Sequence, residues 1–229
     1  MTITLYDLCG ADESHRFSPH CWKTRLSLRH KGLDFETVPV PFTKIADVEG
    51  GASKTVPVIR DGDRVVGESF AIARYLDEAY PDRPLLGSAE VEALTSFLIS
   101  WSHGTVHPVV ARMALVDIHD ALAEDDKAYF RKTREALFGM SLEDFVVKRR
   151  ATTADLEAAV APLAATLKRQ LFLGGEGPLF ADYVVFGPLQ WLRTIQGDGA
   201  LPAEGPVREW FDRLLDMYDG EGRNTKLAA

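Results

Sequence analysis

Two side chains that can take part in chemistry lie close together in RFSPHCWKTRLSL (residues 16–28): the hydroxyl of Ser18 and the thiol of Cys21. Ser18 precedes Pro19, and proline is favoured in the first turn of a helix, so we expect Ser18 at a helix N-terminus. Its oxygen can accept a hydrogen bond from a first-turn N–H while its proton is donated elsewhere. A hydroxyl at a helix N-terminus can stabilise an anion such as a thiolate. A capping role and a chemical role for Ser18 are therefore compatible.

A second motif is TVPVI (residues 55–59). A proline within a strand removes a ladder donor, so this strand lies at a sheet edge or the Val56–Pro57 bond is special. If that bond is cis, the N–H and C=O of Val56 can turn outward and pair with an extended peptide. An ordinary edge-strand proline is the alternative.

A third motif is GESFAIARYL, in which Glu68 and Ser69 lie where a strand meets a helix. Ser69 can cap that helix, and the free N–H groups of the helix N-terminus can bind a carboxylate. Capping alone is the alternative role of Ser69.

The elements that position these motifs alternate over the first 80 residues. Period-two apolar runs predict strands, and capped periodic runs predict helices. The expected strands are residues 2–8, 34–40, 56–61 and 64–69, and the expected helices are 19–31 and 70–80. The first two strands should be parallel because a helix joins them, and the turn at Asp61-Gly62 adds an antiparallel hairpin.

Beyond PDRPLLGS (residues 81–88) the strand patterns end. Apolar residues at helical spacing predict core-facing helices, with Leu94, Phe97, Leu98 and Trp101 in one stripe, Leu156 to Leu171 in another and Val207 to Tyr218 in a third. We expect EDDK (124–127) to be a solvated turn. The boundary near residue 84 predicts an α/β domain (1–84) followed by an all-helical domain (85–229).

Composition narrows the possible functions. The chain has 229 residues, 46% of them hydrophobic and 26% charged, and a net charge of −8, which disfavours nucleic acid and anionic membranes as partners. No apolar run reaches the roughly 18 residues of a membrane span, and the N-terminus has no basic region typical of a secretion signal. Two cysteines cannot build a disulfide framework, so we expect a reduced cytoplasmic protein.

Together, in this order and spacing, the three motifs resemble the glutathione transferase superfamily, over nearly the whole chain. The resemblance implies a thioredoxin-like N-terminal domain (βαβ-ββα), an all-α C-terminal domain, glutathione as co-substrate and a homodimer. It implies that Val56, before Pro57, holds the cysteinyl part of glutathione and that Glu68 and Ser69 hold its γ-glutamyl group. A basic side chain reaches the glycyl carboxylate in many members, and Lys44 and Lys54 are the candidates here.

Several stretches also resemble bacterial β-aryl etherases and their fungal relatives, above all YFRKTREALFGMSLED (residues 129–144), which lies outside the parts common to all glutathione transferases. This resemblance implies thiolate attack on an aromatic ether with release of a phenol, and Ser18 as the residue that activates the thiol. The alternatives are a ligandin-like binder of aromatic compounds and a general conjugating or peroxide-reducing transferase.

Other residues could compete for the activating role. Cys21 lies nearly one turn inside the helix, Cys9 follows the first strand and could line the pocket, and Tyr6 lies within that strand.

The electrophile pocket is expected between the two domains. Its expected lining residues are Phe17, Trp101, His103 and His107, whereas Trp191 is expected in a helix core. The i, i+4 spacing of His103 and His107 also suits a metal, but that window has no acidic or cysteine ligand, so we expect no metal.

One departure from the family concerns a later helix. The family has Ser, Thr or Asn three residues before the aspartate of an AD pair, and here Leu179 precedes Asp182. Asp182 should still stabilise the helix start through the helix dipole, without the reciprocal capping box.

Overall fold

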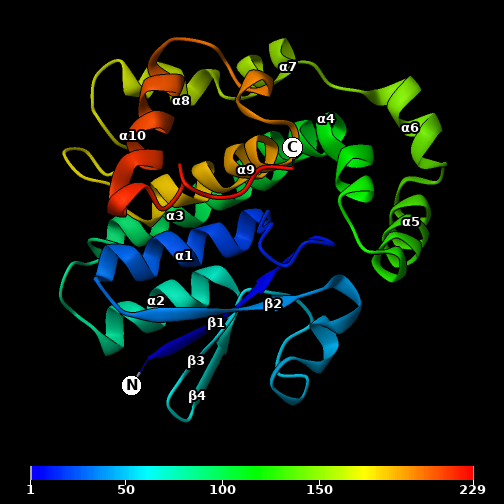
Figure 1. Cartoon of the computed structure of the whole chain (residues 1–229). Helices are drawn as coiled ribbons and strands as arrows, with labels where there is room; N and C mark the ends of the chain where they lie inside the picture. The colour runs from blue at the N-terminus through cyan, green and yellow to red at the C-terminus, as the bar shows by residue number, and fades with distance from the viewer. Residues whose placement is uncertain (1, 229) are drawn as a thin grey trace.

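The computed structural model describes residues 2–228. A small α/β layer at the N-terminus lies beneath a larger group of helices (Figure 1). Within the described residues, no helix combines the length and the apolar character needed to cross a membrane.

One sheet is formed by β1 (Ile3–Leu8), β2 (Phe35–Val40), β3 (Val58–Asp61) and β4 (Arg64–Gly67). Their order within the described residues is β2-β1-β3-β4. β1 is parallel to β2 and antiparallel to β3, with Leu5 opposite Thr37 on one side and Ile59 on the other. The expected thioredoxin-like arrangement is confirmed, because a helix crossover links the parallel pair and the Asp61–Arg64 hairpin adds the antiparallel edge.

Two helices lie on one face of this sheet, α1 (Pro19–Lys31) and α2 (Ser69–Ala79) (Figure 1). The bounds expected for α1 are confirmed. Its end is fixed by Gly32, which adopts the left-handed conformation (φ 68°) and donates its N–H to the carbonyl groups of Arg29 and Leu28. The 3₁₀ segment η1 (Phe42–Gly50) joins β2 to the Val56–Pro57 turn.

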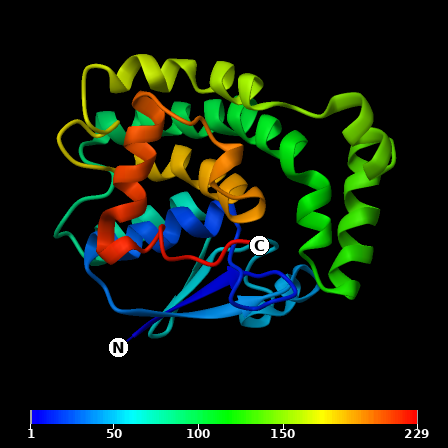
Figure 2. The same ribbon diagram turned by 45° about the horizontal axis from the view of Figure 1, so that its top comes forward.

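Residues 80–88 connect α2 to the helical domain, and the expected boundary at residue 84 lies within them. The helices that follow are α3 (Ala89–Trp101), π-helical η2 (Ser102–Val106), α4 (His107–Asp120), α5 (Glu124–Phe138), α6 (Leu142–Arg149), α7 (Thr153–Ala159), α8 (Ala161–Leu167), α9 (Phe180–Gln196), η3 (Asp198–Ala200) and α10 (Pro206–Gly220). The end of α4 and α5 run side by side along one side of the molecule (Figure 2).

The structure corrects three expectations about these helices. The stripe from Leu156 to Leu171 does not form one helix. Leu156 lies in α7, a new helix starts at α8 with Pro162 in its first turn, and Leu171 lies beyond the end of α8 and is 51% exposed. Leu94 and Phe97 of α3 face outward, with 69% and 71% of their surface exposed. The EDDK segment is not a solvated turn, because it forms the first turn of α5 and its Asp126 is buried.

The two layers meet where α9 packs on α1 (Figure 1). Gly187 of α9 makes this contact close, because a β-carbon at that position would lie 2.3 Å from the carbonyl oxygen of Pro19. The side chain of Trp22 on α1 is buried and packs edge-on against Phe186 of α9. The start of α1, which carries Ser18, is therefore held between the sheet and the helical domain.

Candidate functional site

Ser18 is the N-cap of α1, as expected. Its oxygen accepts a hydrogen bond from the N–H of Cys21 at 3.3 Å, and the residue is buried. The Ser18 hydroxyl is also within hydrogen-bonding reach of the Cys21 thiol. A bound anion at this position could accept the O–H proton instead, and the N-terminus of α1 adds its positive end.

The peptide bond between Val56 and Pro57 is cis. Among the described residues, neither the N–H nor the C=O of Val56 forms a backbone hydrogen bond, although the side chain of Val56 is buried. Pro57 is anchored because its carbonyl accepts the N–H of Glu68. An extended peptide could therefore pair with Val56 as an added strand.

Glu68, not Ser69, caps α2, which corrects the sequence expectation. The Glu68 carboxylate accepts the N–H groups of Phe70 at 2.9 Å and Ala71 at 3.0 Å, while the Ser69 hydroxyl donates to it at 3.3 Å. Glu68 has a φ of 72°, a conformation that non-glycine residues rarely adopt. Such backbone strain is frequent at binding sites, where the surrounding structure maintains it.

A largely apolar cavity of about 480 Å³ opens beside Ser18. Its wall includes Ser18, Val56 and Phe17 from the N-terminal domain, and side chains of α4, α5 and α9 complete it. A cavity of this volume, apolar with a few polar groups, is typical of a site for a small organic molecule.

Of the pocket residues predicted from the sequence, Phe17 and His107 line this cavity, whereas Trp101 and His103 are not part of its wall. Trp101 is partly buried against the core. Trp191, expected in a helix core, lines the cavity instead.

The sequence analysis also missed a wall formed by η1 and α5. Buried Asp126 accepts the N–H groups of Phe42 at 2.7 Å and Thr43 at 2.9 Å, which fixes the start of η1. Phe42 lines the cavity and packs against Phe130, and the guanidinium of Arg134 lies 4.7 Å from the centre of the Phe130 ring. Burial lowers the pKa of Arg134. The apolar and aromatic residues of α5, such as Phe130, can be seen in the sequence. The sequence does not show that they pack against Phe42 of η1.

The two lysines predicted to bind a carboxylate lie outside the cavity wall. Both are exposed, and Lys44 is 3.8 Å from the carboxylate of Asp47.

The three rivals of Ser18 have other surroundings. Burial raises the pKa of the Cys9 thiol to about 11 and raises that of Cys21 well above its ordinary value, so both thiols are protonated at neutral pH. Neither cysteine is part of the cavity wall. The hydroxyl of Tyr6 donates to the carboxylate of Glu49, and Tyr6 is not part of the cavity wall either.

A cluster of nitrogen-bearing side chains lies next to the cavity. Lys23 is buried and its amine lies 3.3 Å from Nδ1 of His20 and 3.5 Å from Nε2 of His103. Burial lowers the pKa of Lys23 to about 8 and that of His107 to about 3, so His107 is neutral at physiological pH. The sequence analysis missed His20, which also lines the cavity.

A second cavity, of about 710 Å³, lies beside the C-terminal segment and is lined by Arg16, Arg25 and Arg29. Two of these arginines are already paired, because Glu221 binds both Arg25 and Arg29 and the Asp7 carboxylate also contacts Arg25. This cavity does not include Ser18 or Val56, so the smaller cavity is the better candidate.

Comparisons with known proteins agree with this geometry. Residues 17–79 match the family described as Glutathione S-transferase, N-terminal domain, and residues 93–215 match Glutathione S-transferase, C-terminal domain. A glutathione S-transferase Z1 of Arabidopsis thaliana is 45% identical over 89 residues, which is 37% of each chain.

Two solved fungal structures are similar over most of the chain. A glutathione transferase of Phanerochaete chrysosporium is 26% identical with a TM-score of 0.82, over 93% of this chain and 96% of that one. A glutathione S-transferase of Ceriporiopsis subvermispora, solved in complex with glutathione, is 25% identical with a TM-score of 0.79, over 96% and 97% of the two chains.

Proposed function

The chain belongs to the glutathione S-transferase family, and we propose that it activates the thiol of glutathione with Ser18 and directs it at an aromatic electrophile. The observation that carries this proposal is that Ser18 and the unpaired backbone of Val56 line one apolar cavity. The protein then supplies positioning and thiolate stabilisation, while the nucleophile comes from glutathione.

Glutathione would bind along the N-terminal domain. The backbone of Val56 pairs with its cysteinyl part, which places the sulfur near the Ser18 hydroxyl. The γ-glutamyl group lies at the start of α2, where Glu68 and Ser69 provide a carboxylate and a hydroxyl. Lys44 and Lys54 remain candidates for the glycyl carboxylate.

The second substrate would occupy the aromatic part of the cavity, between Phe17, Phe42 and Trp191. For an aryl ether with a neighbouring ketone, the glutathione sulfur attacks the carbon that bears the aryloxy group. A C–S bond forms, the C–O bond breaks, and the phenolate leaves with the electron pair and is protonated. The stretch at residues 129–144, within and after α5, supports this etherase-like chemistry.

Ligandin-like binding without turnover is the second candidate, and the size and apolar character of the cavity favour it. A homodimer is the expected assembly. The outward-facing side chains of Leu94 and Phe97 on α3 give it an apolar contact surface.

The proposal is tested by incubating the protein with glutathione and an aryl-ether ketone and measuring phenol release. Release that requires glutathione and falls about tenfold or more in Ser18→Ala, equivalent to about 1.4 kcal/mol, supports it. Tight aromatic binding without release by the wild type would favour the ligandin role. Equal rates in wild type and variant would remove Ser18 from the activating role.

A further inference from the structure

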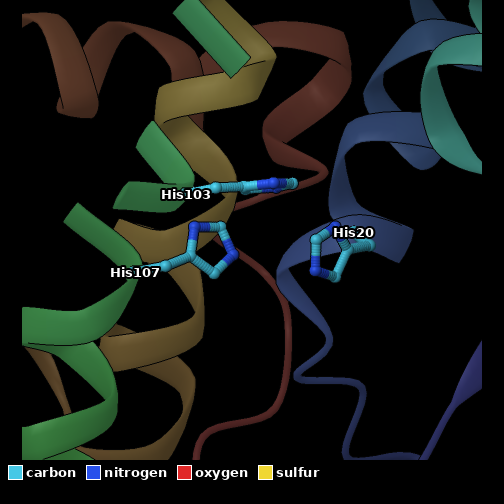
Figure 3. A group of neighbouring side chains, drawn as sticks. All are labelled: His20, His103 and His107. Carbon is cyan, nitrogen blue, oxygen red and sulfur yellow. The ribbon is translucent and has the colours of Figure 1, made fainter. Parts of the chain in front are cut away.

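Three histidines from two separate segments point into one space (Figure 3). His20 belongs to the first turn of α1, His103 to η2, and His107 begins α4. The ring centres of His20 and His103 are 5.3 Å apart, those of His20 and His107 are 5.2 Å apart, and those of His103 and His107 are 4.9 Å apart. One nitrogen from each ring lies within 4.8 Å of the other two.

The backbone places two of these rings on the same side. The N–H of His107 bonds to the carbonyl of Ser102, five residues earlier, which makes this turn π-helical. Turns of this kind are rare and occur frequently at functional sites. Here the wide turn holds His103 and His107 side by side, opposite His20 across the domain interface (Figure 3).

The three rings differ in what their nitrogens contact. Both ring nitrogens of His107 are buried and have no hydrogen-bond partner among the described residues. Nδ1 of His20 and Nε2 of His103 face the amine of Lys23, and an ammonium group only donates hydrogen bonds. Those two nitrogens therefore direct lone pairs at the Lys23 ammonium group, which a metal ion would have to replace.

We propose that His20, His103 and His107 form a binding site for a divalent transition-metal ion, for which Zn²⁺ is the probe. Zinc binds imidazole nitrogens at about 2.0–2.1 Å, so its tetrahedral ligands are about 3.4 Å apart. To bind it, the three ring nitrogens would have to approach one another from separations of up to 4.8 Å, and Lys23 would have to move its amine aside. Exposed His103 provides a route of entry from solvent.

Three protein ligands leave one position of a tetrahedral ion open. His20 and His107 both line the cavity beside Ser18, so the open position would face a molecule bound there. An oxygen donor of that molecule, or water, would complete the coordination. This proposal goes beyond thiol activation, which needs no metal.

The test uses the full chain without a polyhistidine tag, freed of metal by chelation and titrated with Zn²⁺. We expect one Zn²⁺ per chain, and binding at least about tenfold weaker in His103→Ala and in His107→Ala. The matched control is His119→Ala, because His119 also lies on α4 but pairs with Asp120. The His119→Ala variant should bind Zn²⁺ with the same affinity as the wild type.

Co²⁺ gives a second readout, because a tetrahedral Co²⁺ site absorbs visible light and each cluster variant should lose that band. Circular dichroism shows that each variant is folded. Retention on immobilised glutathione reports on the proposed transferase site separately from zinc binding. A wild type that binds no stoichiometric Zn²⁺, or cluster variants that bind it as tightly as the wild type, would overturn the proposal.

Discussion

Gly187 of α9 lies directly against the backbone of Pro19, so a β-carbon there would be 2.3 Å from the Pro19 carbonyl oxygen. Pro19 follows Ser18, so this glycine lets the helical domain approach the start of α1 closely. The close contact between the two domains is thus made next to Ser18, the residue proposed to activate glutathione.

We therefore expect Gly187→Ala to displace the start of α1. Overpacking at a buried contact costs about 1–3 kcal/mol, and glutathione-dependent turnover should fall about tenfold with the shift of Ser18. Thermal unfolding and steady-state kinetics measure both effects. The control is Gly199→Ala, since nothing lies within 4 Å of a β-carbon at that position. Unchanged melting temperature and turnover in Gly187→Ala would contradict the role given to this contact.

The two cysteine thiols should be unreactive in the folded protein. Burial raises the pKa of Cys9 to about 11 and that of Cys21 well above its ordinary value. A thiol with a raised pKa stays protonated as the pH rises from 7 to 9, and only the thiolate reacts. A chromogenic disulfide reagent should label neither thiol rapidly over this range, but both after denaturation. Fast labelling of one thiol per native chain at pH 7 would contradict this prediction and make the labelled cysteine a candidate catalytic residue again.

Asp126 should control the aromatic part of the cavity. Asp126→Ala removes both carboxylate contacts to the N–H groups of Phe42 and Thr43, so the start of η1 is no longer fixed. We expect affinity for an aromatic ligand to fall about tenfold, the equivalent of about 1.4 kcal/mol, while glutathione affinity stays constant. Asp125→Ala is the matched control because Asp125 is exposed on the same turn. Equal ligand affinities in the two variants would show that the loop is held by other contacts.

Asp182 should contribute more to stability than an ordinary helix-capping aspartate. Its buried carboxylate accepts the N–H groups of Leu173, Gly174 and Leu179 and the indole N–H of Trp210. Asp182→Ala leaves these donors unpaired, which should cost about 3 kcal/mol or more.

The matched control for Asp182 is Asp155→Ala. Asp155 occupies the same third position of α7, in a complete but exposed capping box with Thr152. Its loss should cost about 1 kcal/mol. Urea denaturation measures both values, and equal losses would refute the structural role given to Asp182.

Local signals in the sequence were sufficient for the N-terminal domain. Pro19 and Gly32 mark both ends of α1, and the hairpin turn at Asp61-Gly62 sets the register of β3 and β4. The same local signals do not predict which side chains are buried where this depends on contacts between distant segments. Leu94 and Phe97 have helical spacing but face outward, because periodicity identifies an apolar face without showing what covers it.

In the candidate site, too, features set by neighbouring residues differ from features set by contacts between distant segments. The place of Ser18 at the start of α1 could be predicted because it depends on the neighbouring Pro19, whereas the cis bond at Pro57 was one of two alternatives that the sequence left open. The role of Asp126 and the meeting of His20 with His103 could not be predicted, since their partners lie more than 80 residues away. No acidic or cysteine residue lies near His103 and His107 in the sequence, so no metal was expected there, and the sequence did not show that α1 brings a third histidine, His20, beside them.

The most direct test of Ser18 as the activating residue is the pKa of the glutathione thiol bound to the protein, measured by the ultraviolet absorbance of the thiolate against pH. The free thiol has a pKa of about 8.5, and the wild type should lower it by about two units, or about 2.7 kcal/mol. Ser18→Ala should lose at least about one unit of that shift while still binding glutathione. An identical thiol pKa in the two bound complexes would contradict the activation of glutathione by Ser18.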